Sequence, residues 1–466
     1  MDDVEYSGLW WLPSNPENKV AGTLIFSNQD GIELRLIGSL EGFEDLNNNN
    51  LYQVHSVIWG LTDGGKSITL SECLAAGLKI GLPGFVSRDY RIHLCFLSAH
   101  LTEEQLRFRR LIVEYSRLAD WVRTSGLTMT IYDNEPNKRQ FNYTLPDEEK
   151  AVTSKGTVSI DFSFNATGDF FDEMHLRQFI SMEIEANGDY SFDDLMLRYI
   201  RPFQNFLTLA TTKPNSIVRV QVFSKHISFE KSDGSGVVET PIEVIFPQRY
   251  LEAKQDKLLI PNYMLFTLHD IEDFQGTIER WLNVSDELDS VCNLFFGVMY
   301  NSSMYVEQEF LNIVQAVESY HRRRMKNNVL PKEQHKARVE AILSGITDEH
   351  KDWLKELLTY SNEPRLKHRL LELADKADII LSPLITDKEE FAKKVKNTRN
   401  YFTHYDPSLK AKAAHGSELY LLTIKLSYML QACFLLELGF SQEKCIEVFR
   451  RNQGYIQAMN KARQNR

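Results

Sequence analysis

The sequence predicts an α+β protein: a mainly antiparallel β-sheet region with inserted helices, followed by an all-α helical bundle. The first half consists of short β-branched and aromatic runs separated by Gly, Asn and Asp. From about residue 271 the apolar residues recur with the 3.6-residue period of helices. A chain of 466 residues is long enough for two or three domains. We therefore expect a β-rich domain at 1–270, connecting helices at 271–303 and a helical domain at 304–466.

The β-rich half is expected to contain both strands and helices. Thr102 and Gln105 have the spacing of a capping box, and the apolar residues after them recur at roughly helical spacing as far as Gly126. This pattern predicts one helix there, and a second is expected at about 192–210. The asparagine run at 47–50 predicts a loop. Strands are predicted at 19–27, 32–37, 51–59, 66–71, 127–132, 157–164, 179–185, 217–223 and 238–245.

The second half should be helical almost throughout, with prolines in the gaps or at helix starts. Its most apolar stretch, 419–440, is long enough to span a membrane. Lys425, Gln431 and Glu437 interrupt it, however, so we expect a buried core helix and no membrane partner. Helices are predicted at 271–284, 286–300, 304–324, 332–345, 348–360, 363–375, 387–404, 416–438 and 441–452.

Charge and cysteine content suggest where the protein works and what it binds. The formal net charge is −11, but residues 305–466 carry 27 Lys and Arg against 21 Asp and Glu, a net +6. A basic segment on an acidic chain favours a polyanionic partner. The five cysteines are scattered and form no metal-ligand spacing, and the N-terminus lacks the features of a secretory signal. We therefore expect a cytoplasmic protein without a metal site or another cofactor.

Residues 60–67, GLTDGGKS, match the letter pattern of a phosphate-binding P-loop. A P-loop needs a helix directly after it, so that backbone amides and the helix N-terminus face the phosphates. Residues 68–70 instead form a strand-like run, and Asp63-Gly64-Gly65 suits a hairpin turn. We interpret Lys66 as a turn residue; the alternative is a nucleotide-dependent enzyme that uses Lys66.

Segment 396–407, KNTRNYFTHYDP, places polar side chains near the end of a predicted helix. Phe391, Val395 and Phe402 form an apolar stripe, so that side of the helix should be buried. Asp406 precedes Pro407 and is therefore disfavoured from helical geometry. The helix should end about there. This leaves a histidine in the last turn, where the helix dipole favours a protonated imidazole.

The functional candidates on this helix are Arg399, Asn400 and His404. Asn400 lies one turn before His404, where its amide could orient the imidazole. Arg399 is about 140° away from His404 around the helix, at roughly 100° per residue. One chain therefore points the two side chains apart, whereas two copies across a dimer axis could surround one phosphate. The spacing alone also suits a surface ion pair for Arg399 and a simple helix end at His404.

Segment 399–406, RNYFTHYD, resembles the signature of HEPN domains, in which a His follows an Arg by five residues and a polar residue follows the Arg. Residues 310–323, FLNIVQAVESYHRR, resemble the first helix of the ApeA-type HEPN subfamily, including Glu318. The apolar helix after Leu419 is similar to the closing core helix of that subfamily. Residues 8–26 resemble the start of the ApeA N-terminal domain. The resemblance thus covers almost the whole chain, with specific motifs at both ends.

This resemblance implies a metal-independent endoribonuclease of anti-phage defence (abortive infection), with RNA as substrate and commonly active as a homodimer or higher oligomer. It implies catalytic roles for Arg399, Asn400 and His404, with Glu318 as an addition; Glu318 also suits an ordinary ion pair with Arg322, one turn later. A phage-derived trigger of the N-terminal domain is expected on the same ground. A non-catalytic HEPN module for dimerisation or RNA binding is the alternative. Neither the trigger nor the type of RNA can be predicted from these residues.

Overall fold

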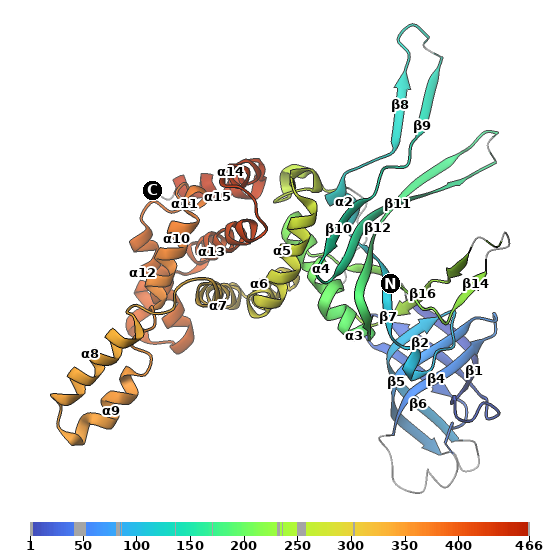
Figure 1. Cartoon of the computed structure of the whole chain (residues 1–466), viewed down its shortest axis with the longest axis horizontal. Coiled ribbons are helices and arrows are strands. Elements are labelled where there is room, and N and C mark those ends of the chain that lie inside the picture. Colours follow the sequence, from blue (N-terminus) through green and yellow to red (C-terminus); the bar gives the residue numbers. More distant parts are fainter. Residues whose placement is uncertain are drawn as a thin grey trace. The chain divides into compact units, whose positions relative to one another are not determined.

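The computed structural model describes residues 3–41, 53–80, 84, 86–135, 137–169, 171–230, 234, 236–248, 258–301 and 303–464. Two compact units divide the chain. The first, a β-rich unit, comprises 1–207, 215–258 and 273–282, and the second, a helical unit, comprises 208–214, 259–272 and 283–466. The asparagine run at 47–50 lies outside the described residues. The α+β class predicted from the sequence is confirmed (Figure 1).

In the β-rich unit, all strand pairs of the described residues are antiparallel, and the largest sheet has the order β10-β11-β12-β7-β13-β16-β6-β3-β2-β1-β4-β5. Strand β6 also pairs with β5, which closes the last six strands into a barrel. The strands of this sheet are β1 (Val4–Trp11), β2 (Val20–Ser27), β3 (Gly31–Leu36), β4 (Val54–Thr62), β5 (Ser67–Ile80), β6 (Val86–Leu97), β7 (Phe108–Tyr115), β10 (Glu149–Thr153), β11 (Gly156–Thr167), β12 (His175–Tyr190), β13 (Ile217–Phe223) and β16 (Ile242–Ile245).

Two smaller ribbons and short helices complete this unit. Strand β8 (Leu127–Ile131) pairs with β9 (Arg139–Tyr143), and β14 (Ser228–Glu230) pairs with β15 (Val237–Glu239). The helices are α2 (Leu118–Val122), α3 (Phe192–Leu195) and α4 (Arg201–Thr211), with a π-helical segment at Met196–Ile200 between the last two. Figure 1 shows the β8–β9 ribbon extending away from the sheet.

The barrel core follows from alternation along its strands, because successive side chains of a strand point to opposite faces. In β3, Ile32, Leu34 and Leu36 are buried, while the residues between them are more exposed. Trp10 from β1 is fully buried in the same cluster, and its indole N–H donates to the backbone oxygen of Gly22 at 3.1 Å. The barrel therefore encloses an apolar core and satisfies the polar atom of its largest side chain.

The predicted helix from Thr102 to Gly126 is wrong for most of its length, and only Leu118–Val122 (α2) is α-helical. The capping box forms, but it begins only a single 3-10 turn, Glu103–Gln105, and the chain then enters β7. Leu111, Val113 and Tyr115 alternate with more exposed residues, a period of two that the helical interpretation missed. Strand pairing with β12 and β13 on both sides decides the conformation, because such non-local contacts override a local capping signal. The helix predicted at 192–210 is confirmed as the continuous segment 192–211.

The P-loop-like segment is a β-hairpin turn, as predicted. Strand β4 ends at Thr62 and β5 starts at Ser67, and the amide of Gly65 donates to the oxygen of Thr62 at 2.9 Å. Gly65 has φ +77°, which suits glycine. A strand rather than a helix follows Lys66, so no helix N-terminus faces a phosphate position, which contradicts the nucleotide-dependent alternative.

Lys66→Ala should leave the melting temperature nearly unchanged, because the side chain is exposed and its one ring contact is with Tyr6, at 5.3 Å. ATP or GTP should not raise the melting temperature of the wild type, measured by differential scanning fluorimetry. A nucleotide at 100 times its Kd would add about 2.7 kcal/mol, which such a measurement detects easily. Nucleotide stabilisation that disappears in Lys66→Ala would contradict the hairpin interpretation.

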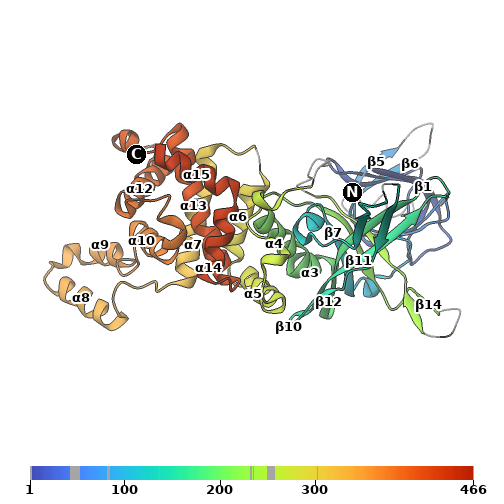
Figure 2. The same ribbon diagram turned by 90° about the horizontal axis from the view of Figure 1, so that it is seen from above.

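The helical unit is built around α13. This helix contacts α7, α10, α11, α14 and α15, and it contributes eleven buried residues. Figure 2 shows α13 within the helical unit. In the described part of the chain it alone is long and apolar enough to cross a membrane, and 61% of its most apolar window is buried within the structure. The α-helices after residue 272, of which α5 lies mostly in the β-rich unit, are α5 (Phe274–Glu287), α6 (Asp289–Tyr300), α7 (Val306–Arg324), α8 (Lys332–Ser344), α9 (Asp348–Leu358), α10 (Leu366–Lys376), α11 (Asp378–Leu381), α12 (Lys388–His404), α13 (Gly416–Glu437), α14 (Gln442–Arg451) and α15 (Gln453–Gln464).

Asp270, in the turn before α5, holds helix α14 of this unit. Its carboxylate is 5% exposed and accepts two bonds from Arg451 at 2.5 and 3.0 Å and two from Thr267 at 2.7 and 2.9 Å. Burial by itself would raise the pKa of Asp270, but the bonds from Arg451 and Thr267 outweigh it and lower the pKa to about 2. The charged carboxylate is therefore the form that stabilises the fold.

Asp270→Asn should lower the free energy of unfolding by about 3 kcal/mol, because it leaves Arg451 partly buried without its ionic partner. The difference from wild type should be full well above pH 3.8, the ordinary pKa of an aspartate, and should shrink as the pH falls to 2, where about half of the folded wild-type carboxylate is protonated. Urea unfolding at several pH values measures both effects. The control Glu447→Gln removes an exposed carboxylate of the same region and should change stability by less than about 0.5 kcal/mol. A difference that persists at pH 2 would contradict this assignment.

Candidate active site

Helix α12 carries the candidate residues and is well defined at both ends. Asp387 caps its N-terminus by accepting from the amide of Glu390 at 2.9 Å. Phe391, Val395 and Phe402 are buried, so the predicted apolar stripe is confirmed. The helix ends at His404, as predicted, because Tyr405 adopts the left-handed conformation with φ 52°.

The segment after α12 holds the helix end in place. Asp406 caps the following 3-10 turn, Pro407–Lys412, by accepting from the amide of Ser408 at 2.9 Å. Hydrogen bonds from Ser408 lower the pKa of Asp406, with smaller contributions from the charges of His404 and Lys412. Further along, the hydroxyl of the fully buried Thr398 accepts from the amide of Ala414 at 2.9 Å. The helix that bears the candidates is therefore fixed to the chain that leads into α13.

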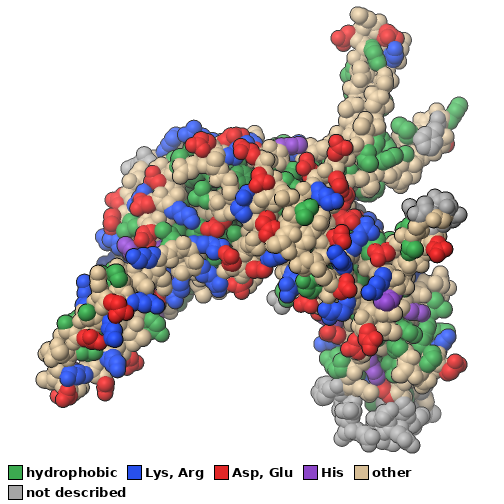
Figure 3. Space-filling model, in the orientation of Figure 1, with side chains coloured by type: hydrophobic (Ala, Val, Ile, Leu, Met, Phe, Trp, Pro, Cys, Tyr) green, Lys and Arg blue, Asp and Glu red, His purple; other side chains and the backbone are tan. Residues whose placement is uncertain are grey.

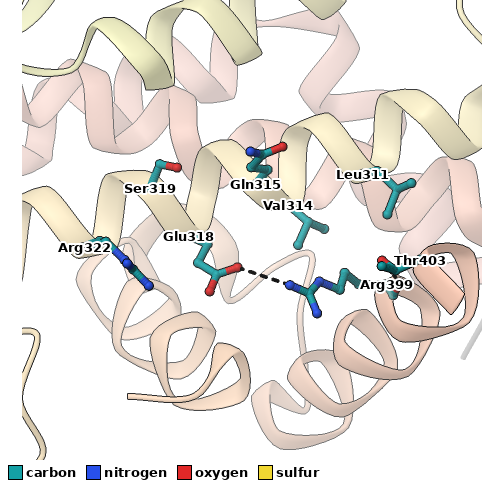
Figure 4. Close-up of a pocket in the computed structure, with 8 residues that line it drawn as sticks. All are labelled: Leu311, Val314, Gln315, Glu318, Ser319, Arg322, Arg399 and Thr403. Carbon is teal, nitrogen blue, oxygen red and sulfur yellow. Dashed lines mark hydrogen bonds and ion pairs between the residues drawn. The ribbon is translucent and has the colours of Figure 1, made fainter. Parts of the chain in front are cut away.

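A pocket of about 460 Å³ lies between α7 and α12. Figure 4 shows Arg399 extending from α12 towards Glu318 on α7, with Arg322 on the far side of Glu318. The guanidinium of Arg399 is 3.9 Å from the carboxylate of Glu318. The walls of the pocket are formed by Leu311, Val314, Gln315, Glu318, Ser319 and Arg322 of α7 and by Arg399 and Thr403 of α12.

The structure brings two of the candidates, Arg399 and Glu318, into one pocket. Glu318 and Arg322, which both belong to the described part of the chain, do not form the ion pair expected on the helix face. Arg322 pairs with Glu363 at 2.8 Å instead. Asn400 accepts from Arg399 at 3.3 Å rather than contacting the imidazole of His404. The amide thus helps to position the guanidinium in this state of the chain.

His404 lies outside this pocket. Its side chain is exposed at the end of α12, and it does not line the pocket that Arg399 enters. This agrees with the rotation of about 140° between the two positions on one helix. One chain therefore presents an arginine pocket and a separate histidine, and a single copy does not bring the two groups together.

A buried polar network lies behind the pocket. Arg369 of α10 is 1% exposed and donates to Nδ1 of His321 at 3.0 Å and to the oxygen of Pro364 at 2.9 Å. Because a guanidinium only donates, Nδ1 of His321 must accept, and the ring proton lies on Nε2, 2.5 Å from Glu372. Burial lowers the pKa of His321, which agrees with this neutral form. The network connects α7 to α10.

Most residues of the pocket were not predicted from the sequence. Leu311, Gln315, Ser319 and Arg322 follow one another at three- or four-residue spacing and so share one face of α7, a signal that the sequence does carry. That α12 would cover this face was not visible, because it is a contact between distant segments.

In the described residues no group of three or more His, Cys, Asp or Glu side chains could hold a metal ion. Basic and acidic side chains are mixed over the visible face of the helical unit (Figure 3).

Comparison with known families gave two matches. The family described as ApeA N-terminal domain 1 matches residues 5–281, which is more than half of the chain. The family described as Apea-like HEPN matches residues 311–444, a range that contains both walls of the pocket and His404. No curated protein and no solved structure gave a match.

Proposed function

The chain belongs to the ApeA family, with an ApeA N-terminal domain followed by an Apea-like HEPN domain, and we propose that it is an endoribonuclease of the HEPN type. HEPN domains generally bind RNA and often form dimers. The observation that carries the proposal is the pocket of the HEPN domain, in which a half-buried arginine, Arg399, lies at the start of the R-x4-H signature. An arginine in such a pocket suits binding of a phosphate group.

The proposed reaction uses a nucleophile that RNA itself provides. The ribose 2′-OH attacks the adjacent phosphorus, the bond to the 5′-oxygen of the next nucleotide breaks, and a 2′,3′-cyclic phosphate and a 5′-OH are formed. His404 removes the proton from the 2′-OH or gives one to the leaving oxygen, and Arg399 stabilises the charge on the phosphorane. DNA lacks the nucleophile, and no metal is needed to generate it.

A dimer completes the proposed site. Arg399 and His404 point apart on one chain, and a two-fold axis that brings two α12 helix ends together places each motif opposite its twin. Two basic motifs repel each other unless a phosphate lies between them, so RNA should strengthen the dimer. The arginine of one chain and the histidine of the other then act on one phosphate.

We further propose a role in anti-phage defence, in which the N-terminal domain responds to a phage-derived trigger; this rests on the family alone. The competing function is a non-catalytic HEPN module that binds RNA. The separation of His404 from the pocket favours this alternative as long as the chain is a monomer.

His404→Ala and Arg399→Ala should each abolish cleavage of single-stranded RNA in EDTA, because each removes one of the two groups that act on the phosphate. Both should keep the wild-type melting temperature to within a few degrees, since neither side chain is buried. Lys396→Ala is the matched control, because it removes an exposed charge of α12 outside the pocket and should leave the cleavage rate unchanged. Wild-type cleavage by the folded His404→Ala variant would contradict the proposed site. RNA binding without cleavage by the wild type would support the non-catalytic module.

Mixing the His404→Ala and Arg399→Ala proteins should restore part of the cleavage activity. Random pairing of equal amounts makes about half of the dimers mixed. In a mixed dimer, one of the two composite sites has an intact arginine from one chain and an intact histidine from the other. About a quarter of wild-type activity is therefore expected. Cleavage assays at several mixing ratios, together with light scattering, measure this. Cleavage by a wild-type protein that remains monomeric at all working concentrations would rule the dimer out.

A further inference from the structure

Arg322 places a second guanidinium in the pocket that contains Arg399 (Figure 4). It lies one helical turn after Glu318 on α7, so that Glu318 has an arginine on each side. The side chain of Arg322 is 53% exposed, whereas that of Glu318 is 28% exposed. A ligand that enters the pocket can therefore reach Arg322 without any change in the fold.

The partner that now holds Arg322 is a shared one. Glu363 accepts from Arg322 at 2.8 Å and from the buried Arg369 at 3.4 Å. Glu363 therefore keeps a partner if Arg322 leaves it, and the loss of one partly exposed ion pair costs the fold little. Arg322 can thus exchange Glu363 for another anion at little cost.

The two arginines meet the pocket at different points along α7, an arrangement that suits a nucleic-acid strand. Arg399 contacts Glu318, and Arg322 is four residues further along α7, so these two positions on α7 are about 6 Å apart. Successive phosphates of an extended single strand are separated by a similar length. One guanidinium group can donate hydrogen bonds to two oxygens of the same phosphate, so each arginine can hold one phosphate.

The neighbouring arginines of α7 do not share this arrangement. Arg323 donates to the backbone oxygen of Glu287 at 2.8 Å and pairs with Asp289, and Arg324 pairs with Glu287 and Glu437. Neither lines the pocket. Of the three consecutive arginines, Arg322 is the one that faces Arg399 across Glu318.

We propose that Arg322 binds the RNA phosphate next to the one held by Arg399, so that the pocket binds two successive phosphates of a single strand. The inference rests on the proposed function, because it takes RNA as the ligand. Its consequence is that the pocket selects a flexible strand over an isolated phosphate. Arg322 is then a binding residue outside the R-x4-H signature, and Glu363 competes with RNA for it.

The test measures binding of a fully 2′-O-methylated RNA oligonucleotide, which cannot be cleaved, to the full chain by fluorescence anisotropy between 50 and 200 mM salt. Arg322→Ala should weaken binding by about tenfold and should reduce the slope of log K against log salt by about 0.7, the value for one phosphate contact on a single strand. Arg323→Ala removes the same charge one residue away and should change affinity by less than twofold. Arg322→Lys should recover part of the affinity, and Glu363→Gln should tighten binding.

Equal affinities and slopes for Arg322→Ala and Arg323→Ala would overturn the inference, and so would unchanged binding by Arg399→Ala. The proposed function fails in a different way: the wild type would then bind the methylated strand but leave unmodified RNA intact. The Glu363→Gln result is independent of folding defects in the arginine variant, because it predicts a gain of affinity rather than a loss. Weaker binding by Glu363→Gln would also overturn the inference.

Discussion

The packing of α12 against α7 determines the geometry of everything at the pocket. Phe402 and Phe310 meet across this interface with ring centroids 6.5 Å apart, and both side chains are almost completely buried. On the same helix, three residues before Phe402, Arg399 extends over the surface of α7 towards Glu318. The apolar contact sets the distance between the two helices, and the polar pair follows from it. The pocket therefore depends on core packing more than on its own ion pair, which is long and partly exposed.

The helical half could be predicted closely because most of its helices are amphipathic and have clear ends. The end of α12 was predicted from Asp406 and Pro407 alone, since the residue before a proline disfavours helical geometry. The strands of the β-rich half were harder to predict from the sequence. Strand β7 is buried between two strands that are distant in sequence, and its apolar residues, with few gaps, also suited a helix. Strands β1 and β6 were not predicted, although Tyr90, Ile92 and Leu94 of β6 alternate with exposed residues.

The same limit applies to the pocket. The signature around Arg399 was recognisable because its residues are adjacent in sequence, whereas Arg322, Glu363 and Arg369 come together only through the packing of α7 and α10. A net +6 for residues 305–466 suggested a polyanion without locating it. In the fold, charges of both signs are mixed on the visible surface, so the local pairing of two arginines carries more information than the total charge (Figure 3).

The α8–α9 hairpin has no buried residue in either helix, although it is inserted within the HEPN domain (Figure 1). Its stem is joined outside the two helices, where Asn362 accepts from the amide of Leu330 at 2.9 Å and donates to its oxygen at 3.0 Å. Because the entropy of closing a loop grows only with the logarithm of its length, each doubling costs about 0.6 kcal/mol. A change in the length of the chain between 331 and 361 should therefore leave the core undisturbed. A fluorescent protein or an affinity tag inserted there would report on the folded protein while leaving the termini free.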